Sequence, residues 1–405
     1  MKGIKYSNLS ATSLLSVQFD KLVFVEKNNN TLAPFKDIEN LCPTYNWAIH
    51  IEDDIKSVRQ NKIAFYLQSD TLVKSVLPIL SKFADSEFII FIPEMDRENS
   101  DTQLVQEGIS YEVFSVTKLK AYKPDILVVL NDWTKLAKYV ILKARKLNVP
   151  TICIQESMID FGTKGRMQFS DAVFLQGLWY LSKLDVKLSF ITGNPRYEHL
   201  LQESSNKKNS VLINCNFTYG IYEEVRESWL SDISNVLDGL NIPFNISQHP
   251  RDRGNLDAFK NVLSSSASSI HSQLKDSSLV ITRFSSLIHE ALFFKIPVIY
   301  YNPHNESQTD NVEIDGVVVR LARNFDELLS EVKSFKASEV DEKEFDTYLY
   351  RNCLSPKGTL LPSDTIANIL KSVQIPVKKI SLMDKVRMFM YQPTIRKISL
   401  FLRRK

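Results

Sequence analysis

The alternation of short apolar runs with longer amphipathic segments is the feature that most constrains the fold of this chain of 405 residues. Such alternation is typical of strand–helix–strand units around a parallel sheet. It begins near residue 60 and predicts one doubly wound domain. The expected strands are residues 62–67, 87–93, 125–130, 150–155, 171–177 and 188–193, and the expected helices are 71–83 and 133–147.

A polar stretch rich in Ser, Asn and Lys, residues 193–210, interrupts this pattern, which then restarts. The second half predicts the same order of elements as the first. Two doubly wound domains would face one another across a cleft, where ligands bind outside the carboxyl ends of the strands. The expected strands are residues 210–215, 244–249, 279–284, 297–301 and 316–321, and the expected helices are 221–238, 255–263, 286–295 and 325–335.

The predicted organisation is therefore α/β with two Rossmann-like domains. We assign residues 1–195 to the first domain, 196–208 to a linker, 209–345 to the second domain and 346–405 to C-terminal helices. Residues 1–60 show strand-like runs at 21–26 and 47–52 and are assigned to the first domain.

The positive charge of the chain is concentrated at its C-terminal end. Residues 376–405 carry nine Lys or Arg and one Asp, a net charge of +8, which leaves −5 for the remainder. Residues 377–405 mix these charges with apolar side chains, as amphipathic helices on anionic lipid do, although a helix packed on its own domain has the same pattern. No aromatic-lined basic groove accompanies the charge, so nucleic acid is not expected as a partner.

The remaining composition limits the location and the chemistry. The first twenty residues lack the apolar core of a secretory signal and no run of eighteen apolar residues occurs, so we expect a cytoplasmic protein held at the inner face of the membrane by its tail. The four cysteines form no CxxC pair, and no His, Asp and Glu cluster has metal-ligand spacing. We expect no metal and no cofactor.

Two serines, Ser285 and Ser286, stand between an expected strand and an expected helix. A helix N-terminus carries unpaired N–H donors and partial positive charge, which suit a phosphate, although an ordinary N-cap also favours serine. Glu290 follows Ser286 by one helical turn, where a carboxylate could accept hydrogen bonds from ribose hydroxyls or simply face solvent.

A histidine and an arginine, His249 and Arg251, follow another expected strand of the same domain. Pro250 between them ends the strand, and both side chains offer donors to phosphate oxygens. The sequence thus predicts a phosphate-binding edge in the second domain.

The order of these motifs resembles a known family. "QHPRDR" (248–253) followed by "LVITRFSSLIHEALFFKIPVIYY" (279–301) is similar to the donor-binding domain of GT-B glycosyltransferases, above all the bacterial capsule and lipopolysaccharide enzymes of the Kdo- and sialyltransferase type and the related CDP-glycerol glycerophosphotransferases. The resemblance extends over about residues 60–340. It implies that His249, Ser285 and Ser286 hold the phosphates of a CMP- or CDP-linked donor and that Glu290 holds its ribose.

The first domain should then be the acceptor side and supply a general base or nucleophile. Its best candidates are Glu156 and then Asp160 in "IQESMIDFG" (154–162), where relatives carry an acidic pair followed by glycine. Either carboxylate could instead cap a helix. Two further pairs follow strands: Asn131 and Asp132 as acceptor-side or turn residues, and Asn194 and Arg196 as hinge residues, with Arg196 also a candidate phosphate contact.

The favoured function is a glycosyltransferase that moves a sugar from a nucleotide-activated donor, a CMP-sugar such as CMP-Kdo or CMP-sialic acid, to a bacterial surface polysaccharide or a lipid-linked glycan. A UDP-GlcNAc 2-epimerase type of enzyme shares the two-domain plan, and a CDP-glycerol glycerophosphotransferase type shares the motifs. A non-catalytic nucleotide- or glycan-binding subunit is also compatible, because Ser157 stands where relatives have glycine.

Overall fold

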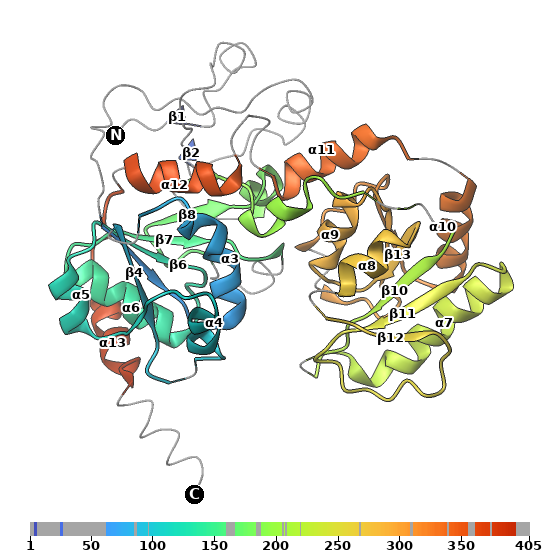
Figure 1. The fold of residues 1–405 in the computed structure, drawn as a ribbon, viewed down its shortest axis with the longest axis horizontal. Coiled ribbons are helices and arrows are strands. Elements are labelled where there is room, and N and C mark those ends of the chain that lie inside the picture. Colours follow the sequence, from blue (N-terminus) through green and yellow to red (C-terminus); the bar gives the residue numbers. More distant parts are fainter. Residues whose placement is uncertain are drawn as a thin grey trace, which may run out of the picture. The chain divides into compact units, whose positions relative to one another are not determined.

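The computed structural model shows two compact units, each an α/β fold (Figure 1). Unit 1 comprises Met1–Glu198 and Cys353–Lys405, and unit 2 comprises His199–Asn352, whereas the sequence placed domain limits at residues 195 and 209. The residues described are 4–5, 25–26, 62–84, 87–95, 97–158, 167–183, 188–204, 206, 209–218, 220–266, 269–307, 311–337, 340–354, 361–372 and 375–393.

Unit 1 is built on a sheet of nine strands among the described residues, in the order β1-β2-β9-β8-β7-β6-β3-β4-β5. All neighbours are parallel except β2 and β9, which pair antiparallel. The strands are β1 (Ile4–Lys5), β2 (Val25–Glu26), β3 (Ile63–Tyr66), β4 (Phe88–Ile92), β5 (Glu112–Val113), β6 (Ile126–Val129), β7 (Thr151–Ile154), β8 (Ala172–Leu175) and β9 (Ser189–Ile191).

Helices cover both faces of this sheet. The crossovers from β3 to β4 and from β6 to β7 run in opposite directions, so right-handed connections place their helices on opposite faces. Helix α12 packs against α3 on one face, and α13 packs against α6 on the other. The helices are α3 (Asp70–Leu80), α4 (Ser100–Gln106), α5 (Val116–Tyr122), α6 (Lys135–Lys146), α12 (Pro362–Ser372) and α13 (Leu382–Met390), with 3-10 turns at Leu178–Lys183 and Pro195–Leu200.

The chain returns to unit 1 at Cys353, whose carbonyl oxygen accepts the Asn194 N–H (2.9 Å). The Ser363 hydroxyl then donates to Glu198 (2.9 Å), and the Lys378 N–H donates to the Asp171 carboxylate (2.9 Å). These contacts fix α12 and α13 as parts of unit 1.

Unit 2 contains a fully parallel sheet with the order β12-β11-β10-β13-β14-β15. In chain order this is 3-2-1-4-5-6, the order of a doubly wound Rossmann fold. The strands are β10 (Val211–Cys215), β11 (Phe244–Gln248), β12 (Val262–Ser264), β13 (Leu279–Thr282), β14 (Val298–Tyr301) and β15 (Val319–Ala322). The helices are α7 (Arg226–Gly239), α8 (Ser269–Lys275), α9 (Leu287–Phe293), α10 (Phe325–Ala337) and α11 (Glu342–Asn352), with a 3-10 turn at Glu223–Val225.

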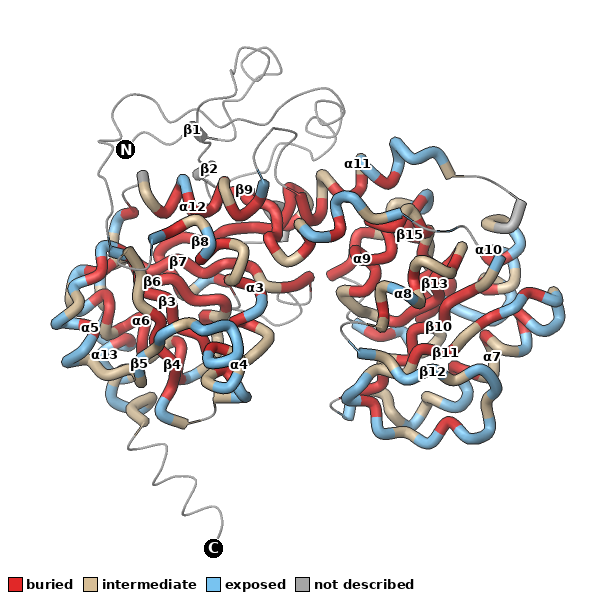
Figure 2. Tube along the Cα trace, in the orientation of Figure 1, coloured by how far each residue is buried: buried red, intermediate tan, exposed pale blue. Residues whose placement is uncertain are grey.

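The central strands are buried along their whole length, which explains their continuous apolar sequences (Figure 2). The core of unit 2 gathers around Trp229 of α7, whose indole N–H donates to the Tyr301 carbonyl oxygen (3.0 Å). The Tyr301 hydroxyl in turn donates to Asp232 (2.6 Å), so the polar atoms of these aromatic side chains are satisfied.

The expected doubly wound organisation of both halves is confirmed, and each strand predicted between residues 62 and 321 is present within three residues of its expected ends, the largest difference being the start of β15 at Val319. One helix was wrong: residues 255–263 form turns that lead into β12. Of the expected strand at 21–26, Val25–Glu26 is observed as β2, and residues 21–24 and the expected strand at 47–52 lie outside the described residues. No described helix is long and apolar enough to span a membrane.

The buried carboxylate of Asp171 is expected to be critical for the stability of unit 1. It pairs with Arg145 (2.9 Å) and accepts the N–H and hydroxyl of Thr151, while both charged side chains are almost fully buried. Asp171→Ala should lower the free energy of unfolding by about 3–5 kcal/mol, because it strands a buried guanidinium. Urea denaturation measures this effect. Glu112→Ala, which breaks an exposed pair with Lys118, is the control and should cost under about 1 kcal/mol; equal losses would contradict the assignment.

Candidate functional site

The candidate site of unit 2 lies where its strand order reverses, between β10 and β13. In open parallel sheets, ligands bind outside the carboxyl ends of the strands at such a switch point. Asn214 of β10 donates to the Thr282 hydroxyl of β13 (2.9 Å), which joins the two strands near these ends. The loops that follow β10, β11 and β13 therefore emerge at one edge, because these three strands are neighbours.

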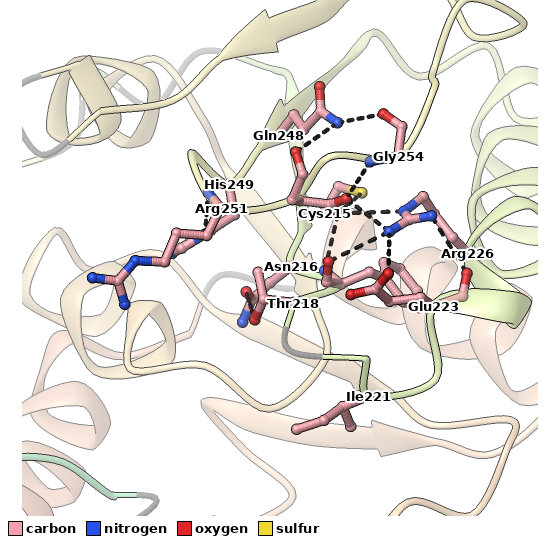
Figure 3. A network of polar contacts seen from close by, with 12 residues as sticks. Cys215, Asn216, Thr218, Ile221, Glu223, Arg226, Gln248, His249, Arg251 and Gly254 are labelled. Atoms are coloured by element: carbon pink, nitrogen blue, oxygen red, sulfur yellow. Dashed lines mark hydrogen bonds and ion pairs between the residues drawn. The ribbon is translucent and has the colours of Figure 1, made fainter. Parts of the chain in front are cut away.

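A buried carboxylate, Asp252, organises the loop after β11. Figure 3 labels three of its partners, Cys215, Arg226 and Gly254. It accepts the N–H groups of Phe217 (3.0 Å) and Gly254 (2.9 Å) and pairs with Arg226 at 2.8 Å. The Cys215 thiol also donates to it (3.3 Å), and burial together with Asp252 raises the pKa of that thiol. The loop after β11 is thereby tied to the loop after β10.

His249 is the first residue of this loop and is half-buried. Its Nδ1 accepts the N–H of Arg251 (3.1 Å), so the neutral imidazole carries its proton on Nε2. Burial and the neighbouring Arg251 lower the pKa of His249, whereas Asp252 opposes them. The residue is thus held as a neutral N–H donor. In Figure 3 the Arg251 side chain extends away from the Arg226 network.

Arg283, which the sequence reasoning missed, joins the loops after β10 and β13. Its guanidinium is fully buried, pairs with Glu306 (2.7 Å) and donates to the carbonyl oxygens of Asn216 (3.1 Å) and Ile221 (3.3 Å). It also lies over the Phe217 ring, 4.0 Å from its centroid. Burial raises the pKa of Glu306, and Arg283 opposes this shift. The sequence signal that could have identified Arg283 is its position directly after an apolar strand and shortly before the two serines.

The two serines differ in the structure. The Ser285 hydroxyl accepts the Leu287 N–H (3.2 Å) and so acts as a cap of α9, which was one of the two expectations. Ser286 makes no side-chain cap hydrogen bond. Helix α9 is also shorter than expected and spans seven residues. Ser286 therefore has the hydroxyl that remains for a ligand role.

Glu290 is buried on α9, where its carboxylate lies 3.1 Å from Nε2 of His271 on α8. The crossover from β12 to β13 places α8 beside α9, and the sequence reasoning did not predict α8. The His271 ring in turn packs against His199 and Phe294, with centroids 5.3 and 5.8 Å away. Glu290, the residue predicted to bind the ribose, is thus already bonded to His271.

Unit 1 has its own switch point, between β3 and β6, and a pocket of about 200 Å³ lies there. Asn131 donates to Gln68 (2.8 Å), and the Thr134 hydroxyl contacts both side chains. The lining mixes polar side chains with three leucines and an indole. Its members include Gln68, Ser69, Glu98, Asn131, Trp133 and Glu156.

Glu156 is the candidate catalytic carboxylate that lines this pocket. It pairs with Arg196 at 3.1 Å, and its carbonyl oxygen accepts the Asn194 side-chain amide (3.0 Å). Asn194 also donates to Gln176 (3.0 Å) and accepts the Arg196 N–H (3.0 Å). The structure thus brings Asn194 and Arg196, expected mainly as hinge residues, to Glu156. Asp160, the second candidate, lies outside the described residues.

Asp132 has a structural environment. Its buried carboxylate accepts the N–H groups of Met167 (2.8 Å), Phe169 (2.7 Å) and Ser170 (2.9 Å). Burial raises the pKa of Asp132, and these three hydrogen bonds oppose the shift. Of the expected pair, Asn131 lines the pocket, whereas Asp132 holds the backbone of residues 167–170.

Comparison with known proteins supports the fold. No protein-family model and no curated protein matches the sequence. Among solved structures, a putative UDP-N-acetylglucosamine 2-epimerase from Listeria monocytogenes matches 77% of this chain and 96% of its own, with a TM-score of 0.53 and 13% identity. The Methanocaldococcus jannaschii UDP-GlcNAc 2-epimerase in complex with UDP-GlcNAc and UDP covers 76% and 99%, with a TM-score of 0.53 and 15% identity.

The glycotransferase of kitacinnamycin matches 85% of this chain and 99% of its own, with a TM-score of 0.50 and 13% identity. These similarities confirm the expected GT-B type of fold, with two Rossmann-like domains. At these identities they establish the fold alone.

Gly254 is expected to be required beside Arg226. A Cβ at this position would lie well inside van der Waals contact of the guanidinium that pairs with Asp252. Gly254→Ala should therefore displace Arg226 and lower the free energy of unfolding by about 1–3 kcal/mol, measured by urea denaturation. In Gly239→Ala at the end of α7, the added Cβ meets nothing within 4 Å, so no loss is expected. If the two variants behaved alike, the loop would not depend on this close approach.

His289 on α9 should make unit 2 sensitive to acid. Its ring is fully buried and packs near Tyr348, and burial lowers its pKa to about 4. An unfolded histidine has a pKa of about 6.5, so the unfolded state binds more protons between these values and stability falls as pH falls. From pH 7 to pH 5 the loss should be about 2 kcal/mol in urea denaturation. His289→Gln should show a shallower pH dependence, and an unchanged slope would refute the assignment.

Proposed function

We propose that this chain is a glycosyltransferase that uses a CMP-sugar of the CMP-Kdo or CMP-sialic acid class as donor. The observation that carries the proposal is the set of loops at the switch point of unit 2, where His249 is held as a neutral Nε2–H donor and Ser286 keeps a hydroxyl outside the helix cap. These donors suit the leaving phosphate of a nucleotide-sugar. The order of the His-Pro, Ser-Ser and Glu-Ala-Leu motifs supports the CMP-sugar class.

In this proposal the pocket of unit 1 binds the acceptor, a surface polysaccharide or lipid-linked glycan. The polar side chains of its lining offer hydrogen bonds to sugar hydroxyls, and Trp133 offers an apolar face to a sugar ring. Glu156 takes the proton of the attacking acceptor hydroxyl, and Arg196 positions its carboxylate. The enzyme would act at the inner face of the cytoplasmic membrane, with residues 377–405 as its contact.

A UDP-GlcNAc 2-epimerase type of enzyme is the second candidate, because two of the similar structures above are such epimerases. An epimerase needs several acid and base groups around the sugar. Within the described lining of the unit 1 pocket, the carboxylates are Glu98 and Glu156. This small number favours the transferase, in which one general base is enough.

Nucleotide binding tests the donor. A thermal-shift titration with CMP, CDP, UDP and GDP should show stabilisation by CMP, about 2.7 kcal/mol at 100 times its dissociation constant. Ser286→Ala should abolish that shift without loss of stability, whereas Ser285→Ala removes a cap and should cost about 1 kcal/mol. A shift with UDP alone would favour the epimerase, and no shift with any nucleotide would refute the site.

Turnover tests the base. Glu156→Gln should lower kcat about 10²–10⁴-fold while nucleotide binding is kept, because the amide cannot accept the acceptor proton. Glu98→Gln changes the other carboxylate of the same pocket and is the matched control: because Glu98 belongs to the acceptor lining, any effect should fall on KM, and kcat should stay near that of the wild type. A large loss in Glu98→Gln with an active Glu156→Gln would reverse the assignment.

A further inference from the structure

Helix α13 presents an apolar face to solvent. Of the eleven large hydrophobic side chains that are exposed among the described residues, five belong to this short helix. They recur at helical spacing and so lie on one side of it. This α13 apolar face consists of Leu382, Met383, Val386, Phe389 and Met390, whose exposed fractions run from 52% to 79%.

The orientation of this helix is fixed by its polar side. Ser381 and Asp384 form a capping box at its start, with both hydrogen bonds at 3.1 Å. Arg387 pairs with Asp384 (3.1 Å) and lies over the Phe169 ring, and the helix packs against α6. The preceding Lys378 is anchored through its N–H to Asp171. The apolar side chains are therefore held outward by the fold.

The surroundings of the α13 apolar face are basic. Helix α6 contains several lysines and no acidic residue, and α5 has the same character. By the crossover rule both helices lie on the face of the sheet that α13 also covers. The lysines concerned are Lys120 and Lys123 on and directly after α5, Lys135, Lys138, Lys143 and Lys146 on α6, and Lys379 and Lys385 around α13, whereas Lys118 of α5 is paired with Glu112.

This combination points to lipid. A helix of nine residues is about 14 Å long and cannot cross a hydrocarbon core of about 30 Å. An amphipathic helix with a basic polar side instead lies in the interface plane, where its apolar side enters the acyl region by about 5–10 Å. A second copy of this chain would oppose two basic surfaces, which disfavours association through the same face.

We propose that the α13 apolar face inserts into the surface of an anionic phospholipid bilayer, with the lysines of α5 and α6 at the level of the lipid phosphates. The side chains of Leu382, Val386 and Phe389 supply the apolar contact. The lysines supply attraction of about 1 kcal/mol per charge near the surface, which weakens at high salt. This inference rests on the membrane contact of the proposed function, residues 377–405, and specifies it, while its test does not depend on the nucleotide site.

Vesicle co-sedimentation of the full chain tests the proposal. The protein should bind vesicles of phosphatidylglycerol and phosphatidylcholine, bind pure phosphatidylcholine at least tenfold more weakly, and release at 0.5 M salt. Val386→Ser, and the double change Leu382→Ser with Phe389→Ser, should weaken binding at least tenfold. Val105→Ser on α4 removes a valine of the same unit that is even more exposed than Val386, 67% against 52%, and is the matched control with wild-type binding.

Folding and function are checked in the same variants. Thermal unfolding and the CMP-induced shift of Val386→Ser should equal those of the wild type. If CMP gives no shift even in the wild type, the proposed nucleotide site fails, but vesicle binding still tests the membrane contact. Wild-type vesicle binding by folded Val386→Ser and the double variant would overturn the proposal. So would light scattering that shows a dimer in the wild type and a monomer in these variants.

Discussion

Two buried ion pairs, Asp252 with Arg226 and Arg283 with Glu306, hold the candidate nucleotide edge together. Asp252 joins the loop after β11 to the loop after β10 through the Phe217 N–H. Arg283 joins the loop after β13 to that same loop through the Asn216 carbonyl oxygen, and its partner Glu306 follows β14. Neither pair is placed to bind a ligand. Loss of one partner would leave a buried charge uncompensated, so these loops are expected to move only together. His249 and Ser286 lie on the loops that these contacts connect.

Unit 1 uses the same arrangement with different residues. Asp132 gathers the backbone of residues 167–170, and Gln176 and Asn194 fix the backbone on which Glu156 lies. In each unit one buried carboxylate near a strand end is structural, Asp132 in unit 1 and Asp252 in unit 2. The two Rossmann-like units thus share a design in which buried carboxylates shape the loops and less buried side chains remain for ligands.

The strands were predictable from the sequence because their burial on both sides requires continuous apolar runs. The helix expected at 255–263 was wrong, because the Gln248 amide holds the Gly254 carbonyl oxygen (2.8 Å) and Asn255 caps a turn (2.7 Å), contacts that periodicity does not contain. The structural role of Asp132 was equally hidden, since a carboxylate after a strand looks the same whether it faces solvent or backbone. The contact of Glu290 with His271 depends on a crossover that brings α8 beside α9.

The route of the chain through the two units affects how the protein can fold during synthesis. Unit 2 is one continuous segment, His199–Asn352, inserted between the two segments of unit 1. Because domains fold as units while the ribosome elongates the chain, unit 2 has all its residues before α12 and α13 exist. Until then α3 and α6 lack the helices that cover them, so nascent unit 1 exposes apolar surface. A chaperone would therefore be needed most by unit 1, whose second segment is synthesised after unit 2.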